Sequence, residues 1–239
     1  VFPSRRSLVL LKYHPIYTKI ELDFHFTKDG ELIWSHSNHM DGHLIANTNY
    51  RDFRYVFTLE DVLEILGNSK DLLIELKNYP VFLQKQGCLL LKALAGLKYW
   101  EKQVEIESFN EHLIATLLEL QKNEELASIK LGLIINLFKT FKYRKCFPKE
   151  CRDVSFVALS NELFEWPIVN GDYQIYREIL PHVKEYAWSW DALYKETPRR
   201  MENYIVKGVD GIATSNPFLV RELLSLIHIS EPTRRVVIS

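Results

Sequence analysis

The sequence predicts an α/β protein folded as a (β/α)8 TIM barrel. Short apolar segments alternate with amphipathic helical segments along most of the chain, and 47% of its 239 residues are hydrophobic. Repeated strand–helix units predict a parallel sheet, and closing such a sheet into a barrel commonly takes roughly 250 residues. The chain is therefore long enough, and apolar enough, to form one barrel around a sizeable core.

The expected strands are apolar runs bounded by turn residues. We place them at residues 19–26, 72–77, 104–109, 130–135, 153–159, 185–190 and 209–214. Residues 32–36 run back from the turn at residues 28–30 as a short extension of the first of these strands. This gives seven of the eight strands of a barrel, and the absent one is the first.

Capping residues indicate where helices begin. Thr58, with Asp61 three residues later, predicts a helix with a buried apolar stripe. Asn110 caps a helix that runs to about residue 123, and Asn216 followed by Pro217 begins the last helix. A further helix is expected over residues 81–98.

Residues 7–14 allow two interpretations, a remnant of the first barrel helix or a first strand ending at His14. Only six residues separate His14 from Glu21, whereas a parallel crossover needs about a dozen or more. The spacing therefore favours the helix remnant, and with it a chain that lacks its first strand.

The carboxyl-terminal residues look foreign to the domain. Residues 224–234 match the in-frame translation of a transposase-type sequencing adapter, and residues 235–239 show no usable periodicity. We expect the barrel to occupy residues 1–223, and residues 224–239 to be an artefact that packs no further than an extension of the last helix.

Composition excludes several classes of protein. The formal net charge is −1 and no basic patch is interleaved with aromatic residues, which argues against a nucleic-acid partner. No apolar run reaches the roughly 20 residues of a membrane span. Cys88, Cys146 and Cys151 are too sparse for a disulfide framework and fit reduced thiols, although the last two are close enough to pair. The sequence does not specify the compartment.

Carboxylates alternate along two of the expected strands. Side chains two positions apart share a face of a strand, so Glu21 lies with Asp23 and Glu75 lies with Lys77. His36 is the last residue of the short extension. Three carboxylates can hold a hard cation, a histidine can move a proton, and a lysine can neutralise phosphate charge. The pattern is typical of a metal-dependent site for a phosphate ester.

These residues, in this order, resemble the glycerophosphodiester phosphodiesterase family, whose barrel is similar to that of phosphatidylinositol-specific phospholipase C. The likeness spans roughly residues 19–223 and continues through three further segments: Val104-Glu105-Ile106-Glu107-Ser108-Phe109-Asn110, Tyr186-Ala187-Trp188-Ser189-Trp190-Asp191, and Gly208-Val209-Asp210-Gly211-Ile212-Ala213-Thr214-Ser215-Asn216-Pro217. The last resembles the closing Gly-Val-Asp-Gly-Ile-x-Thr-Asp-x-Pro signature of the family.

The resemblance implies roles for the aligned residues. Glu21, Asp23 and Glu75 would hold Mg²⁺ or Ca²⁺, and His36 and Lys77 would be catalytic. A second histidine of the family lies in a His-Arg-Gly motif on the first strand, which this chain does not contain. The sequence also departs from the family directly after His36, where Ser37 replaces the usual aspartate.

Further side chains are candidates for the rim of the site. Trp188 and Glu107 are expected to bind substrate, and Glu107 is equally a candidate extra ligand. His25 shares the face of Glu21 but fits a packing role, and Trp190 fits either a pocket or the core. The basic residues at 139–145 fit a solvated face.

The implied reaction is metal-dependent hydrolysis of glycerophosphodiesters to glycerol 3-phosphate and an alcohol. Because one of two histidines is missing, we expect the chain as given to be impaired. The alternatives are a pseudoenzyme that binds phospholipid headgroups, or a lysophospholipase D- or sphingomyelinase D-like lipid phosphodiesterase. The expected partner is thus a glycerophosphodiester or lysophospholipid substrate.

Overall fold

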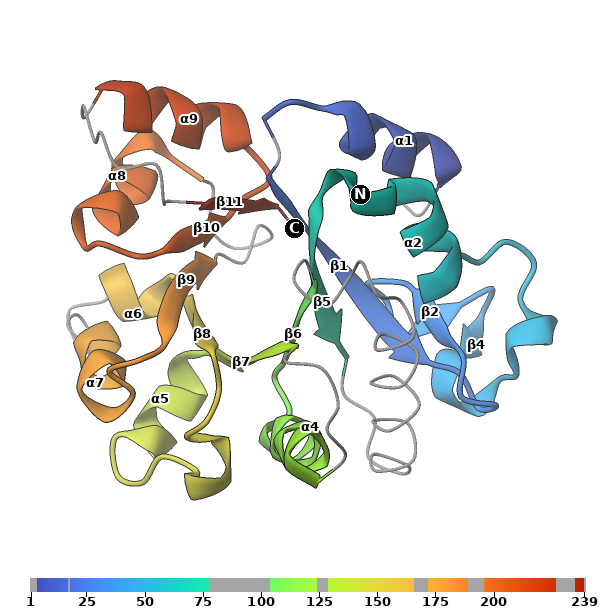
Figure 1. Ribbon diagram of the computed structural model, residues 1–239, viewed down its shortest axis with the longest axis horizontal. Coiled ribbons are helices and arrows are strands. Elements are labelled where there is room, and N and C mark those ends of the chain that lie inside the picture. The colour runs from blue at the N-terminus through green and yellow to red at the C-terminus, as the bar shows by residue number, and fades with distance from the viewer. Residues whose placement is uncertain are drawn as a thin grey trace.

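The computed structural model describes residues 4–16, 18–77, 104–123, 129–165, 172–188, 196–226 and 235–238. In these residues a ring of strands surrounds the centre of the molecule and helices surround the ring (Figure 1). The helix expected over residues 81–98 lies outside the described residues, as do Cys88 and Trp190.

Eight parallel strands form the ring. In order around it they are β1 (Lys19–Phe26), β5 (Asp71–Leu76), β6 (Val104–Ser108), β7 (Lys130–Ile135), β8 (Phe156–Ser160), β9 (Lys184–Trp188), β10 (Gly211–Ala213) and β11 (Arg235–Ile238). The pairing of β11 with β1 closes the ring. The (β/α) barrel predicted from the sequence is confirmed, and all seven predicted strands are present with shifts of up to three residues at their ends.

The last strand corrects one expectation. Residues 235–238 were expected to lie outside the domain, but β11 pairs in parallel with β10 and with the start of β1, in the position of the missing first strand. Val236, Val237 and Ile238 favour extended backbone, and the two flanking strands would otherwise leave unpaired backbone groups there. Four residues are too few for a periodicity, so the sequence pattern did not reveal this strand. The boundary at residue 223 and the adapter origin of the tail stay predictions.

The chain adds a ninth strand to the same sheet directly after β1. Strand β2 (Leu32–Trp34) turns back antiparallel to the end of β1. A small hairpin follows, made of β3 (His39–Met40) and β4 (His43–Leu44), and then two 3-10 turns at Ile45–Asn47 and Tyr50–Asp52. The expected extension at residues 32–36 thus ends two residues early, and the loop that follows folds over one end of the barrel wall.

The helices are α1 (Arg5–Tyr13), α2 (Leu59–Leu66), α4 (Glu111–Asn123), α5 (Leu137–Tyr143), α6 (Glu162–Glu165), α7 (Asp172–Ile179), α8 (Pro198–Val206) and α9 (Pro217–Leu226). Short 3-10 turns follow α2 at Gly67–Ser69 and precede β8 at Lys149–Cys151. The helical interpretation of residues 7–14 is confirmed by α1, and the three predicted helix starts at Thr58, Asn110 and Asn216 are confirmed by their capping bonds.

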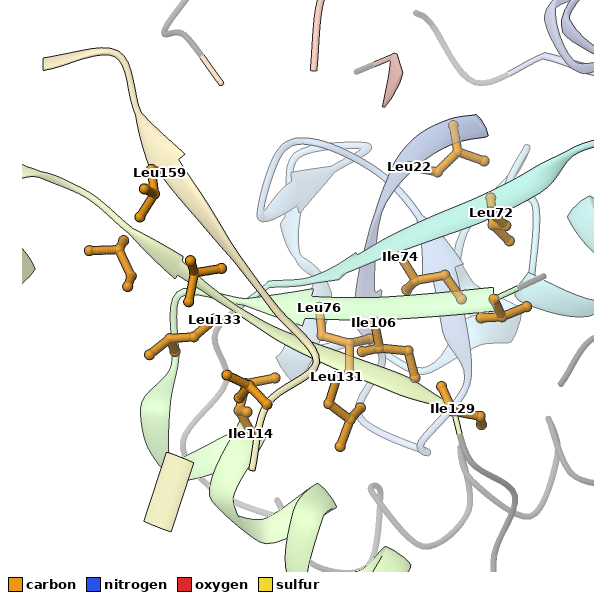
Figure 2. Packing of buried hydrophobic residues seen from close by; sticks show 14 of the residues in the cluster. Leu22, Leu72, Ile74, Leu76, Ile106, Ile114, Ile129, Leu131, Leu133 and Leu159 are labelled. Atoms are coloured by element: carbon orange, nitrogen blue, oxygen red, sulfur yellow. The ribbon is translucent and has the colours of Figure 1, made fainter. Parts of the chain in front are cut away.

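Two apolar layers result from the alternation of side chains along each strand. The larger layer lies between the sheet and the helices and includes Leu22, Ile74, Ile106, Leu133 and Leu159, which Figure 2 shows pointing away from the strands into the packing. The smaller layer lies inside the ring and consists of Leu73, Ile134, Phe156, Ala158 and Tyr186. Because one face of every strand supplies the outer core, the other face is left to line the interior.

Candidate active site

Polar side chains replace apolar ones on the inner face of β1 and β5. On β1, the outer core takes Ile20, Leu22 and Phe24, so Lys19, Glu21, Asp23 and His25 face inward. On β5 the same alternation turns Glu75 inward. The parallel register sets Asp23 beside Glu75 and Glu21 beside Leu73, one layer deeper. The carboxylates that the sequence placed on common faces therefore meet inside one barrel.

Glu21, Asp23 and Glu75 form one cluster. Each offers a carboxylate oxygen, and these three oxygens lie within 4.8 Å of one another. Lys77 joins the cluster: its Nζ lies 2.6 Å from Asp23 Oδ1 and 2.8 Å from Glu75 Oε2. The backbone N–H of Lys77 donates to Phe24 O at 3.0 Å, which extends the pairing of the two strands beyond β5 and fixes the lysine above the carboxylates.

The cluster carries an excess of buried negative charge. Glu21 and Glu75 are each 8% exposed. Burial raises the pKa of Glu75 to about 7, against the lowering effect of Lys77, and burial together with Asp23 and Glu75 raises the pKa of Glu21 well above its usual range. Burial alone would lower the pKa of Lys77, but Glu75 and Asp23 raise it above its ordinary value. One lysine does not balance three carboxylates.

An oxygen of the cluster is also left without a partner. Glu75 Oε1 is buried and accepts no hydrogen bond from the described residues, a costly arrangement for a carboxylate. Carboxylate oxygens at this spacing are ligands that Mg²⁺ and Ca²⁺ prefer. The residues present therefore fit a divalent cation.

His36 follows the end of β2 and is exposed. Ser35, directly before it, donates its backbone N–H to Asp23 O at 3.0 Å and so ties the end of β2 to β1. Ser37, in the place of the family aspartate, accepts a hydrogen bond from the backbone N–H of His39 at 3.1 Å. The structure thus brings His36 to the same end of the barrel as the carboxylates, on a segment anchored to β1.

His25 is a buried histidine of β1 that interacts with His36. It is 3% exposed, and burial followed by the positive charge of Lys77 lowers the pKa of His25 to about 4, although the backbone of His36 and the carboxylate of Asp23 act in the opposite direction. A histidine with this pKa is neutral at pH 7, which agrees with the packing role expected for it.

Two aromatic side chains pack against the apolar cluster inside the ring. Trp188 is at the end of β9, where its Nε1–H donates to Ala158 O at 3.1 Å. Phe109 directly follows β6, and its ring meets the Trp188 ring edge to face, with 5.6 Å between centroids. The pair thus joins the ends of β6 and β9 through an apolar contact.

Comparison with known proteins gives the chain a family context. No family model matches it. A curated glycerophosphodiester phosphodiesterase from Caldanaerobacter subterraneus subsp. tengcongensis is 28% identical over 229 aligned positions, with 83% of this chain and 82% of that protein covered. These findings, with the shared fold described next, support assignment to the glycerophosphodiester phosphodiesterase family.

Two solved structures share the fold. A glycerophosphodiester phosphodiesterase from Parabacteroides distasonis superposes with a TM-score of 0.72 at 18% identity, covering 94% of this chain and 90% of its own. An Oleispira antarctica phosphodiesterase in complex with the product sn-glycerol-3-phosphate gives 0.67 at 14% identity, with 92% and 90% covered. Glycerophosphodiester phosphodiesterases are hydrolases, and the barrel predicted from the sequence is the fold of these relatives.

One buried network in this phosphodiesterase-like barrel was not predicted from the sequence. Below the carboxylate cluster, Lys19 forms an ion pair with Glu105, and the Tyr186 hydroxyl lies 3.2 Å from Lys19 Nζ and 3.0 Å from Glu105 Oε2. The residues come from three strands that are far apart in the sequence. The only signal in the sequence was that each residue occupies an inward position of its strand. The network closes the floor of the site with paired charges.

Glu107 is the remaining inward carboxylate. It follows Glu105 on the inner face of β6 and stands in register with Glu75. Burial, then Glu75 and Glu105, raise the pKa of Glu107 well above its usual range. The structure thus places it beside the carboxylate cluster.

Proposed function

We propose that the protein is a divalent-cation-dependent phosphodiesterase that hydrolyses glycerophosphodiesters to glycerol 3-phosphate and an alcohol. The observation that carries the proposal is the convergence of Glu21, Asp23, Glu75 and Lys77 inside one end of the barrel. Barrel enzymes build their sites at the carboxyl ends of the strands, and a phosphodiester needs its negative charge offset as it reacts.

Glu21, Asp23 and Glu75 would hold the cation, which supplies positive charge to a nonbridging phosphate oxygen when bound. Lys77 provides a second positive charge. It already bridges Asp23 and Glu75, so a bound phosphate group would exchange one anionic partner of the ammonium group for another. The lysine stays protonated throughout, because those two carboxylates raise its pKa above the ordinary value.

His36 moves the proton. Its exposed position lets it reach a substrate that enters from solvent, and an imidazole is suited to protonating the leaving alcohol or accepting the proton of the nucleophile. His25 is buried and its lowered pKa makes it a weaker base, so we assign the acid–base role to His36.

Trp188 and Phe109 would accommodate the apolar side of the glycerol backbone or of the alcohol. Their rings contact each other edge to face near the ends of β6 and β9. The Oleispira antarctica relative was solved with sn-glycerol-3-phosphate, and we propose that the same product leaves the site of this chain. Lysophospholipids are a second substrate class, with a larger alcohol-side group to place along these two rings.

A second function follows if His36 acts without a second acid–base histidine. A site of that kind would bind glycerophosphate headgroups and hydrolyse them slowly or not at all. General acid–base catalysis contributes roughly 10²- to 10⁴-fold to the rate. The hydrolysis rate of such a site would be lower by up to that factor.

The test measures the release of glycerol 3-phosphate from glycerophosphocholine and the release of choline from lysophosphatidylcholine. Each reaction is run with Mg²⁺, with Ca²⁺ or with a chelator. Glu75→Gln and His36→Ala should each lower the rate by about 10²-fold or more. Glu64→Gln, an exposed glutamate on α2, is the matched control and should retain the full rate. Cation-dependent headgroup binding without turnover would replace the hydrolase with the binding protein. Turnover that is indifferent to the chelator and to Glu75→Gln would refute the proposed site.

A further inference from the structure

Glu107 lies next to the proposed cation site on the inner wall of the barrel. Its Cα is paired with that of Glu75 on one side and with that of Gly132 on the other. It is 6% exposed. Its charge contributes to the raised pKa of Glu21, and the charge of Glu75 contributes to the raised pKa of Glu107. The side chain is thus part of the same electrostatic environment as the cluster.

The carboxylate of Glu107 is not fully paired. Its Oε2 atom is buried and accepts no hydrogen bond from the residues that the structure describes. The adjacent Glu75 Oε1 is in the same condition. Two neighbouring buried carboxylates, each with an unsatisfied oxygen, are costly in a protein interior.

The nearby cations are engaged elsewhere. Lys77 bridges Asp23 and Glu75, and Lys19 pairs with Glu105. On the side away from Glu75, Gly132 has no side chain, and the ring of Phe156 fills the space that its Cβ would take. Among the described residues, no hydrogen bond reaches Glu107 Oε2 from that side, and the charged groups that act on Glu107 include Glu75 and Lys77 of the carboxylate cluster.

We infer that Glu107 is a fourth carboxylate of the cation site and holds the ion through one of the water molecules in its coordination shell. Glu107 stands beside the trio whose oxygens are within 4.8 Å of one another, which is why the contact is assigned to a bound water. A metal-bound water donates two hydrogen bonds, and a buried carboxylate oxygen without a partner is a suitable acceptor for one of them. The inference rests on the cation of the proposed function.

Four carboxylates and one nearby lysine would give the centre a formal charge of −3 when all are ionised. A divalent cation offsets most of that charge and gives the water-facing oxygen of Glu107 a partner. Groups that hold a metal-bound ligand in place typically change metal affinity by about 10- to 100-fold. Removing the charge of Glu107 should therefore weaken cation binding without removing any of the three direct ligands.

The experiment is calorimetric titration of the chelator-treated protein with Ca²⁺ and with Mg²⁺, with thermal unfolding of the same samples. Glu107→Gln keeps the shape and removes the charge. We expect its dissociation constant for the cation to rise by about tenfold or more, while its melting temperature without cation stays equal or rises because a buried repulsion is gone. A merely structural role would lower that melting temperature and leave the affinity of the folded fraction unchanged.

Three further variants make the result decisive. Glu107→Ser removes the same charge with a smaller side chain and should weaken binding as Glu107→Gln does. Glu75→Gln should abolish measurable binding, and Glu64→Gln should leave it unchanged. Wild-type affinity in both Glu107 variants, with binding lost in Glu75→Gln, would overturn this inference and leave the proposed function intact. No cation binding by the wild-type protein would overturn both.

Discussion

Two residues of one strand determine most of the site. Glu21 and Asp23 occupy inward positions of β1 between residues of the outer core, so a shift by one position would bury them under the helices. The alternation of apolar and acidic residues is visible in the sequence, and this is why the carboxylate cluster could be predicted from it. The parallel register of β1 with β5 then brings Glu75 and Lys77 to the same cluster.

Other residue contacts could not be predicted because they depend on barrel closure. Lys19 and Glu105 are 86 positions apart, and Lys19 and Tyr186 are 167 apart. Each is an ordinary polar residue at an inward strand position. Their pairing depends on which strands face one another across the lumen. A local sequence pattern holds no information about that arrangement.

Cation affinity should depend on pH through Glu75. With its pKa raised to about 7, this carboxyl is largely protonated at pH 6 and largely ionised at pH 8 when no cation is bound. A proton therefore competes with the cation below pH 7, so the affinity should fall as the pH is lowered from 8 to 6, and binding at pH 6 should release protons. Titrations in buffers of different ionisation enthalpy measure both. An affinity that is constant from pH 6 to 8 would contradict the electrostatic description of the cluster.

Lys77 should separate cation binding from turnover. In Lys77→Met the competing ammonium group is gone from Asp23 and Glu75, so cation affinity should be equal or higher. Hydrolysis should fall by about 10²- to 10³-fold, the usual cost of removing one group that stabilises developing charge. Calorimetry and the glycerol 3-phosphate assay on the same preparation distinguish the two effects. Loss of cation binding in this variant would mean that the lysine organises the carboxylates.

Among the elements, β7 requires a glycine at one inward position. Gly132 faces the lumen, and a Cβ built there would lie 2.1 Å from Cε2 of the buried Phe156 ring. Gly132→Ala should destabilise the barrel by about 1–3 kcal/mol or more, as overpacking of a core does. Chemical denaturation gives the value. The double variant Gly132→Ala with Phe156→Leu makes room for the methyl group and should recover part of the loss. An alanine that is tolerated alone would show that this ring moves freely.

The start of α2 shows which local structure the sequence specifies best. Thr58 Oγ1 accepts from the backbone N–H of Asp61 at 3.1 Å, and Asp61 Oδ2 accepts from the backbone N–H of Thr58 at 2.9 Å. Thr58→Ala should cost about 1 kcal/mol of the free energy of unfolding. Thr58→Ser keeps the acceptor and is the control, with a change of only a few tenths of a kcal/mol. Equal stability of the two variants would argue that the cap contributes nothing.

Elements with weaker local signals were missed. None of α5, α6, α7 and α8 was predicted from the sequence, nor was the hairpin of β3 and β4. Helix α6 and the two strands of the hairpin have too few residues for a clear apolar period, and β11 follows a stretch that resembled no part of a barrel. Predicted strands were right in order and kind because an apolar run between turn residues marks each one. Their ends shifted because the last residue of a strand is set by its neighbour in the sheet.

At the scale of the whole molecule, closure of the barrel brings residues from separate strands together in one site. Closure of the ring sets β1 beside β5 on one side and β11 on the other (Figure 1). The inward carboxylates Glu21 and Asp23 of β1 and Glu75 of β5 thereby come together. In the part of the chain that the structure describes, no helix is both long and apolar enough to cross a membrane.

The most direct test of this account is the rate at which chelator-treated protein releases glycerol 3-phosphate from glycerophosphocholine before and after Mg²⁺ or Ca²⁺ is added. We predict that release requires the cation, and that Glu75→Gln abolishes the response while Glu64→Gln does not. A rate that is the same with and without the cation, and the same in Glu75→Gln, would contradict the claim that these carboxylates form the active centre.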